Sequence, residues 1–256
     1  MEVKEYAEGI PSWVDLSSSD IEGSRRFYAE LLGWTVEPGP PETGGYSNAT
    51  VRGLMVAGVG PQMDPNIPPH WTAYVNVGDA DSVAGRVSAA GGTMAFGPDD
   101  VMEFGRLGLF LDPTGAALGL WEPKSHRGAG LVNEPGAFCW NELVTSDTAA
   151  AKAFYHEVFG WDAVTHGEGA HEYTEFQVGG NSIAGMMPKQ PDMPAETPSL
   201  WGIYFAVDDI SAALEKTKSL GGTAITETME TPQGSFAVVA DQVGAIFSVI
   251  QLATSS

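Results

Sequence analysis

The chain of 256 residues has one cysteine, Cys139, and few basic side chains. A single cysteine excludes internal disulfides and favours a reducing, cytoplasmic location. Lys and Arg number 12 against 33 Asp and Glu, so the formal net charge is −21. This charge repels phosphate backbones and anionic membranes, and no apolar run approaches the roughly 20 residues of a membrane span. We therefore expect neither nucleic acid nor a membrane as a partner.

Short catalytic motifs are missing as well. The chain contains no Walker loop, dinucleotide fingerprint, catalytic triad or zinc motif. Its start has no basic segment followed by an apolar core, so no ordinary signal peptide is expected. Hydrophobic residues make up 43% of the chain and glycines number 32, as is typical of a globular, turn-rich protein. Function must therefore be inferred from the arrangement of the fold.

The chain does contain an internal repeat. Residues 10–34 and 137–161 share a strand-like segment, a Ser-Asp pair and a helix-like run ending in Gly-Trp. The offset between matched positions stays between 127 and 130 residues, which predicts two copies of one module. The matched aromatic residues are Trp13 and Trp140, Tyr28 and Tyr155, Trp34 and Trp161, and Trp71 and Trp201. The predicted boundaries are 1–122 for the first module, 123–136 for a linker and 137–256 for the second module.

Each module is predicted to have an α+β fold. In the first, Ser12–Ser18 alternates as a strand, and Asp20 begins a helix that stops at Gly33. A second helix is expected over Asp79–Ala90, followed by two strands joined at the Asp112–Gly115 turn. The pattern is strand, helix, two strands, a Pro-rich loop at 61–69, then strand, helix, two strands and an optional last strand. A loop at 188–199 corresponds to 61–69 in the second copy.

The order strand, Ser-Asp, helix, Phe-Tyr, Leu-Gly-Trp, Asp-Pro-Thr-Gly resembles the vicinal oxygen chelate superfamily. This superfamily contains glyoxalases, extradiol dioxygenases and bleomycin-resistance proteins. The segments Trp-Val-Asp-Leu, Trp-Asn-Glu-Leu and Gly-Ala-Ile-Phe-Ser-Val are similar to the tandem glyoxalase-like proteins of actinobacteria. The resemblance implies two tandem modules of paired βαβββ units, with cup-shaped sheets and an internal pseudo-dimer. It does not by itself give the function, because this fold carries several chemistries.

The resemblance also implies places for a divalent metal held by His, Gln or Glu. In this chain those places hold side chains that do not ordinarily bind metals. They are Trp13, Thr72 and Gly119 in the first copy, and Trp140, Gly202 and Ser248 in the second. A register slip of two residues would bring in His70, which would stand alone. We therefore expect no metal and no other cofactor.

Strand alternation predicts which side chains line the cups. If Val14 and Leu16 pack under the helix, the alternate residues of the strand point into the first cup. Aromatic walls there predict a slot for a flat ring system, since stacking adds roughly 0.5–1.5 kcal/mol per ring pair beyond burial. Simple filling of the cups is the alternative explanation. The predicted ligand-binding residues are Trp13, Thr72, Tyr74, Asn76, Phe110, Trp121, Trp140 and Tyr204.

Asp15 and Glu142 are the candidate catalytic residues. Each sits in the middle of a strand beside a tryptophan, where desolvation raises a carboxyl pKa and suits it to acid–base chemistry. A structural hydrogen bond to a backbone amide or a hydroxyl of the facing module is the alternative. Arg106 is the first candidate counter-ion, and Arg52 is the second.

Three functions are compatible with the sequence. The favoured one is metal-independent binding of a hydrophobic, planar small molecule, such as an aromatic polyketide antibiotic, for sequestration, transport or resistance. The second is a metal-independent lyase or hydroxylase-type enzyme of secondary metabolism that uses Asp15 or Glu142 as acid or base. The third is a metal-dependent glyoxalase or dioxygenase. We expect a monomer or a weak homodimer, with an aromatic small molecule as the partner.

Overall fold

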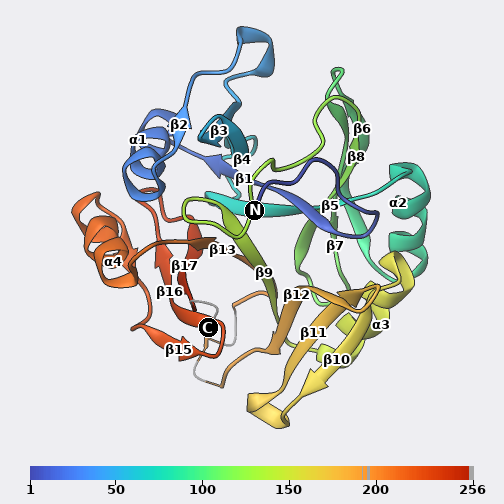
Figure 1. Ribbon diagram of the computed structural model, residues 1–256. Helices are drawn as coiled ribbons and strands as arrows, with labels where there is room; N and C mark the ends of the chain where they lie inside the picture. Colours follow the sequence, from blue (N-terminus) through green and yellow to red (C-terminus); the bar gives the residue numbers. More distant parts are fainter. Residues whose placement is uncertain (192, 195–196, 254–256) are drawn as a thin grey trace.

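A computed structural model describes residues 1–191, 193–194 and 197–253 and shows two sheet-rich halves (Figure 1). The fold is α+β, with four α-helices among the described residues. Residues 192, 195 and 196 of the predicted loop 188–199, and 254–256 at the end of the predicted second module, lie outside the described residues. Within the described ranges, no helix combines the length and the apolar character needed to cross a bilayer.

The first half is one eight-stranded sheet in the order β2-β3-β4-β1-β5-β8-β7-β6. It consists of two βαβββ units joined where β1 pairs antiparallel with β5. Its elements are β1 (Pro11–Ser18), α1 (Ile21–Leu32), β2 (Thr35–Val36), β3 (Ser47–Val51), β4 (Leu54–Pro61), β5 (His70–Asn76), α2 (Ala80–Ala89), β6 (Thr93–Val101), β7 (Gly105–Leu111) and β8 (Ala117–Pro123).

The second half repeats this arrangement in the order β10-β11-β12-β9-β13-β17-β16-β14, with β15 paired to β16. Here β9 and β13 form the antiparallel junction between the two units. Its elements are β9 (Phe138–Thr145), α3 (Thr148–Phe159), β10 (Asp162–His166), β11 (Tyr173–Val178), β12 (Asn181–Pro188), β13 (Leu200–Ala206), α4 (Ile210–Ser219), β14 (Thr223–Ala224), β15 (Met229–Thr231), β16 (Gly234–Ala240) and β17 (Ile246–Leu252).

Local sequence signals explain the helix ends. The Asp20 side chain accepts a hydrogen bond from the Gly23 amide at the start of α1, and Gly33 ends the helix with φ 72°. Asp147 and Gly160 do the same for α3. The prediction missed β2 and β6. β2 has only two residues, and β6 is an edge strand with two register irregularities and a Gly-Pro-Asp-Asp sequence that reads as a turn.

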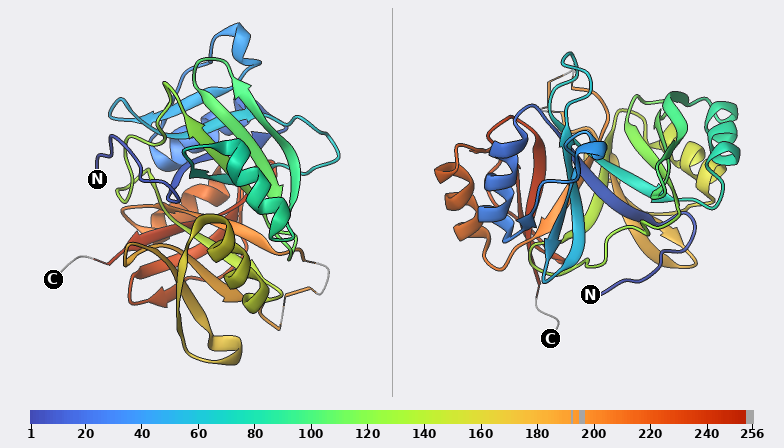
Figure 2. Two further views of the ribbon diagram at one scale, coloured as in Figure 1. Left: turned by 90° about the vertical axis from the view of Figure 1, so that its right-hand side faces the viewer. Right: turned by 90° about the horizontal axis from the view of Figure 1, so that it is seen from above.

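The two modules pack with their helices in pairs. α1 lies beside α4, and α2 lies beside α3 (Figures 1 and 2). The helix-side faces of the two sheets meet between these pairs, where the ring centroids of Trp71 and Phe205 are 4.9 Å apart. One continuous hydrophobic core therefore spans both modules.

The repeated Tyr and Asp motifs meet across this interface in both directions. Tyr28 Oη donates a hydrogen bond to Asp241 Oδ2 at 3.0 Å, and Tyr155 Oη donates one to Asp112 Oδ2 at 2.8 Å. All four side chains are buried. The Phe-Tyr motifs and the turns at 112–115 and 241–244 thus bind one module to the other, as an internal pseudo-dimer requires.

The Leu-Gly-Trp motif makes a second pair of reciprocal contacts. Trp34 Nε1 donates to the carbonyl oxygen of Gly136, and Trp161 Nε1 donates to that of Gly9. The two glycines lie just before the first strand of each module and have φ of 83° and 81°, a conformation that favours glycine. Each tryptophan therefore fixes the entry of the other module's first strand.

Candidate functional site

The face of each sheet opposite the helices carries most of the predicted site residues. Strand pairing places Trp13 opposite Tyr74 and Asp15 opposite Thr72 on one face, as alternation along β1 predicts. We call this face the cup of its sheet. The first cup carries Trp13, Asp15, Thr72, Tyr74, Asn76, Gly119 and Trp121, and the second carries Trp140, Glu142, Gly202, Tyr204, Ala206, Ser248 and Ile250.

Phe110 lies on the opposite face, so its predicted position in the cup was wrong. Leu109 pairs with Gly119 on the cup face, whereas Phe110 pairs with Leu118 and is fully buried. Its ring packs against Phe154 of the second module, with 5.8 Å between centroids. The alternation of side chains between the two faces is reliable only within one strand, because the turn before a new strand determines which of its residues face the cup.

Asp15 is the centre of a hydrogen-bonded cluster in the first cup. Tyr74 Oη donates to Asp15 Oδ1 at 3.1 Å, and Tyr46 Oη donates to Asp15 Oδ2 at 3.3 Å. Trp13 Nε1 in turn donates to Tyr46 Oη at 3.0 Å. We call these four residues the first carboxyl–phenol cluster.

The second cup contains the matching cluster around Glu142. Tyr204 Oη donates to Glu142 Oε1 at 2.8 Å, and Trp140 Nε1 donates to Tyr173 Oη at 3.1 Å. These four residues form the second carboxyl–phenol cluster. Both carboxyl groups thus have phenol hydroxyl partners in their own module, whereas the structural alternative expected a backbone amide or a hydroxyl of the facing module.

Sequence reasoning missed the third aromatic residue of each cluster, Tyr46 and Tyr173. They precede or begin β3 and β11, strands whose faces were not predicted. The available signal was the repeat itself, because the two tyrosines are 127 residues apart, the same offset as Trp13 and Trp140.

Glycines make room for the phenol rings. A Cβ atom on Gly58 would lie 1.9 Å from Tyr46 Oη, and one on Gly119 would lie 2.1 Å from the Tyr74 ring. Any larger residue at either position would displace a tyrosine from Asp15. The absence of a side chain at Gly119 is therefore part of how the first cluster is built.

Burial sets the acidity of both clusters. Burial raises the pKa of Asp15 to about 7, while the hydrogen bonds from Tyr74 and Tyr46 oppose this rise. Burial also raises the pKa of Glu142, against its hydrogen bonds from tyrosines. The pKa values of Tyr74 and Tyr204 are raised by burial and by the neighbouring carboxyl group, so these phenols stay protonated donors near neutral pH.

The arginines predicted as counter-ions are elsewhere. Arg106 pairs with Asp81, with 2.6 Å between Nη1 and Oδ2, and Arg52 pairs with Glu134. The buried carboxyl groups thus have phenol partners instead of cationic ones. The rise in the Asp15 pKa that burial causes is therefore opposed only by the hydrogen bonds from Tyr74 and Tyr46.

Asn76 and Trp121 of the first cup bind the chain's own backbone. The Asn76 amide donates to the carbonyl oxygens of Tyr6 and Ala7 at 2.9 and 3.2 Å. Trp121 Nε1 donates to the carbonyl oxygen of His126 at 2.7 Å. Both predicted ligand-binding residues are buried under the N-terminal segment and the linker.

The residues at the metal positions that the resemblance implies do not fit a metal. The Tyr74 ring covers Gly119, and Trp13 uses its only polar atom to bind Tyr46. Nδ1 of His70 lies 2.8 Å from the carbonyl oxygen of Pro68. In the described part of the chain, no three His, Cys, Asp or Glu side chains gather closely enough to hold an ion.

Divalent metals are therefore expected to leave the protein's stability unchanged. A ligand that binds the folded state raises its stability, so Mn²⁺, Zn²⁺, Ni²⁺ and Fe²⁺ should each shift the melting temperature by less than about 1 °C. Scanning calorimetry against a chelator-treated sample, with elemental analysis after dialysis, measures this. About one metal ion per chain, lost in Asp15→Ala or Glu142→Ala, would contradict the expectation.

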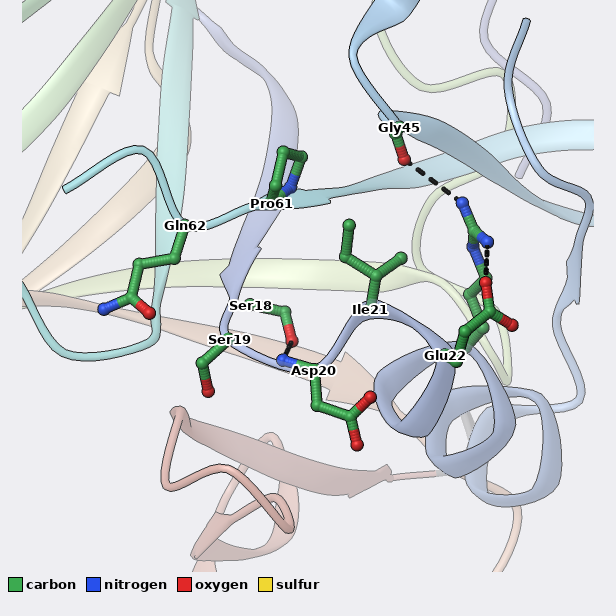
Figure 3. Close-up of a pocket in the computed structure, with 9 residues that line it drawn as sticks. Ser18, Ser19, Asp20, Ile21, Glu22, Gly45, Pro61 and Gln62 are labelled. Atoms are coloured by element: carbon green, nitrogen blue, oxygen red, sulfur yellow. Dashed lines mark hydrogen bonds and ion pairs between the residues drawn. The ribbon is translucent and has the colours of Figure 1, made fainter. Parts of the chain in front are cut away.

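A polar hollow of about 500 Å³ lies outside the cups, at the start of α1 (Figure 3). Arg25 at its edge already binds Glu22 and the carbonyl oxygen of Gly45. The hollow is acidic and open, and it has no aromatic wall. Its lining residues are Ser18, Ser19, Asp20, Ile21, Glu22, Arg25, Gly45, Pro61 and Gln62.

Comparison with known proteins adds three findings. The model of the Glyoxalase/Bleomycin resistance protein/Dioxygenase superfamily matches residues 10–120 and 138–249. The chain is 40% identical over 258 residues to "Putative glyoxylase CFP32" of Mycobacterium tuberculosis, with 96% of each chain covered. It is 33% identical over 262 residues to "Anthracycline biosynthesis protein DauV" of Streptomyces sp. (strain C5), with 96% of this chain and 94% of the relative covered.

Solved structures share the fold at low identity. The Mn(II)-bound glyoxalase from Novosphingobium aromaticivorans has a TM-score of 0.66 and 13% identity, covering 96% of this chain and 83% of that one. The 2,3-dioxygenase LapB from Pseudomonas sp. KL28 also has a TM-score of 0.66 and 13% identity, covering 96% and 93%. At such identities the likeness concerns the fold alone.

Proposed function

The chain belongs to the Glyoxalase/Bleomycin resistance protein/Dioxygenase superfamily and is related to anthracycline biosynthesis proteins, and we propose that it binds a planar aromatic small molecule without a metal. The observation that carries this proposal is the carboxyl–phenol cluster, which takes the place of metal ligands in both cups. The second cluster offers a partly exposed indole, Trp140, for stacking, and phenol oxygens for hydrogen bonds. The role we propose is sequestration, transport or resistance for an aromatic polyketide.

The chemistry of the clusters specifies the ligand further. Tyr204 Oη donates its one hydrogen to Glu142, so its lone pairs can accept a hydrogen bond from a ligand hydroxyl or amine. The carboxyl groups accept a hydrogen bond from a ligand hydroxyl or amine when ionised and donate one when protonated. The net charge of −21 favours a neutral or cationic molecule over an anionic one. A hydroxylated polycyclic quinone, with or without an amine, meets each of these conditions.

A second candidate function is metal-independent acid–base catalysis on the same class of molecule. The observation that favours it is the pKa of Asp15, raised by burial to about 7, together with the raised pKa of Glu142. A carboxyl group that titrates near the working pH is suited to proton transfer. Formation of a new product during incubation with the ligand, seen by mass spectrometry, separates this function from binding alone.

Binding is expected to depend on the second cluster and not on metal. Titration of 1,4-dihydroxyanthraquinone and of an amino-sugar anthracycline, followed by tryptophan fluorescence quenching and calorimetry, should give dissociation constants below about 100 μM. Tyr204→Phe removes a hydroxyl that can accept from the ligand and that holds Glu142 in place, and it should weaken binding about threefold to tenfold, which corresponds to about 1 kcal/mol. Addition of a chelator should leave the dissociation constant unchanged.

The control is Met63→Ala, which truncates a side chain that is 89% exposed and should bind like the wild type. If no planar aromatic compound binds below about 100 μM, the binding proposal fails. If a chelator abolishes binding, the metal-independent part of the proposal fails. Turnover of the compound would move the catalytic function to first place.

A further inference from the structure

We infer that the two cups differ in use: the second takes the aromatic ligand, and the chain's own linker fills the first. This inference rests on the proposed function and names the site for it. The linker begins where β8 ends at Pro123, and it returns over the first cup before it reaches β9. The linker contacts the aromatic walls of the first cup in the way that a bound ligand would.

The side chain of His126 occupies the first cup between two indoles. Its ring lies 4.4 Å from that of Trp13 and 5.4 Å from that of Trp121, centroid to centroid, in edge-on arrangements. The two tryptophans are only 4% and 6% exposed. The stacking surfaces of the first cup are thus already covered.

The His126 ring is neutral as well as flat. Burial lowers its pKa to about 4, and its Nδ1 accepts a hydrogen bond from the Gly128 amide at 3.1 Å. In the neutral ring the proton is therefore on Nε2, which is buried with no partner. The first cup therefore accepts an uncharged aromatic ring that lies edge-on against an indole.

Hydrogen bonds fasten the linker over the first cup. Tyr6 Oη donates to the carbonyl oxygen of Ala129 at 2.8 Å, and the Ala129 amide donates to that of Ser12 at 2.8 Å. Asn76 holds the N-terminal segment beside it. A polar hollow of about 270 Å³ is found at this place, lined by Glu5, Tyr6, Asn76, Pro123, Lys124 and Arg127.

The second cup lacks the groups that hold this cover. Ala206 stands where the first cup has Asn76, and Ile250 stands where it has Trp121, so neither position can donate a side-chain hydrogen bond. Trp140 is partly exposed and has no ring contact within the described residues. Its indole is therefore available to a ligand.

A smaller residue also opens the second cup at its centre. Gly202 replaces Thr72, and a Cβ atom there would meet only the carbonyl oxygen of Glu142, at 3.6 Å. Phe236 adds an aromatic wall, with its ring centroid 5.4 Å from that of Tyr204. In the complex we propose, a fused aromatic ring with oxygen substituents lies between this wall and Trp140, in the position that the His126 ring has in the first cup.

Calorimetry with 1,4-dihydroxyanthraquinone tests the assignment. The wild type should bind one molecule per chain. Trp140→Ala should weaken binding at least tenfold, whereas the matched variant Trp13→Ala should change it less than twofold. His126→Ala should uncover the first cup and raise the stoichiometry from one to two. Thermal unfolding of each variant shows that it is folded.

The outcomes separate the two proposals. Two equivalent sites in the wild type, or equal losses in Trp13→Ala and Trp140→Ala, would overturn the assignment of the cups and leave the proposed function intact. Absence of binding to the wild type would overturn the proposed function as well. If His126→Ala does not fold, the wild-type stoichiometry and the pair of tryptophan variants decide the question.

Discussion

Replacement of Asp112 by alanine is expected to lower the free energy of unfolding by about 3–5 kcal/mol. The Asp112 carboxylate accepts hydrogen bonds from the Thr114 amide and hydroxyl and from the Ala116 amide, at 2.7 to 3.0 Å. It also accepts one from the buried Tyr155 hydroxyl of the other module. The alanine variant leaves these donors buried without a partner, which costs more than the loss of a single bond. Urea denaturation followed by circular dichroism measures the effect.

Two further variants show whether the interface is responsible. Tyr155→Phe removes the bond between the modules and also the acceptor of the Trp201 indole, whose Nε1 donates to Tyr155 Oη at 2.8 Å, and should cost about 1–3 kcal/mol. Asp99→Ala, on the exposed edge strand β6, should cost less than about 0.5 kcal/mol. A loss below about 1 kcal/mol in Asp112→Ala would mean that the turn reorganises and that the reciprocal bonds do not hold the modules together.

The protein is expected to lose stability as the pH rises from about 4 to above 7, through Asp15. In the folded state this carboxyl group has a pKa of about 7, while in the unfolded chain it has the ordinary value near 4. Between these values the folded state holds a proton that the unfolded state has released, so stability falls with rising pH. The difference corresponds to roughly 4 kcal/mol over the whole range. The raised pKa of Glu142 acts in the same direction.

Asp15→Asn tests this contribution because its side chain cannot ionise. Its unfolding free energy should decline less between pH 4 and pH 8 than that of the wild type, and at pH 8 it should be the more stable protein. Asp162→Asn, at an exposed position in β10, is the matched control and should follow the wild-type curve. Parallel curves for the wild type and Asp15→Asn would show that Asp15 is ionised in the folded protein.

Strand alternation and the repeat predicted most of the residues that face the cups. Alternation along β1 placed Trp13 and Asp15 on the cup face because both lie within a single regular strand. The constant offset then carried the assignment to Trp140 and Glu142. The predicted faces of Thr72, Tyr74 and Asn76 on β5 and of Trp121 on β8 agree with the strand pairing. The prediction failed for Phe110 on β7, where Leu109 is the residue that pairs with Gly119 on the cup face.

The cover of the first cup could not be predicted from composition. Residues 123–136 contain Pro, Gly and polar side chains, which indicate a connection but not the surface on which it packs. His126 has no counterpart in the repeat that would have drawn attention to it. Its role depends on contacts with Trp13 and Trp121, which are 113 and 5 residues away in sequence and meet only in the folded sheet.

The reciprocal bonds between the modules have the geometry of a homodimer whose subunits have been fused into one chain. Tyr28 meets Asp241 as Tyr155 meets Asp112, which is how a twofold interface repeats each contact. Two fused subunits present two equivalent faces but share only one connecting peptide. That peptide can cover one face and not the other. The joining of the two subunits into one chain therefore breaks the twofold symmetry of the dimer. It would do so even if the two halves had identical sequences.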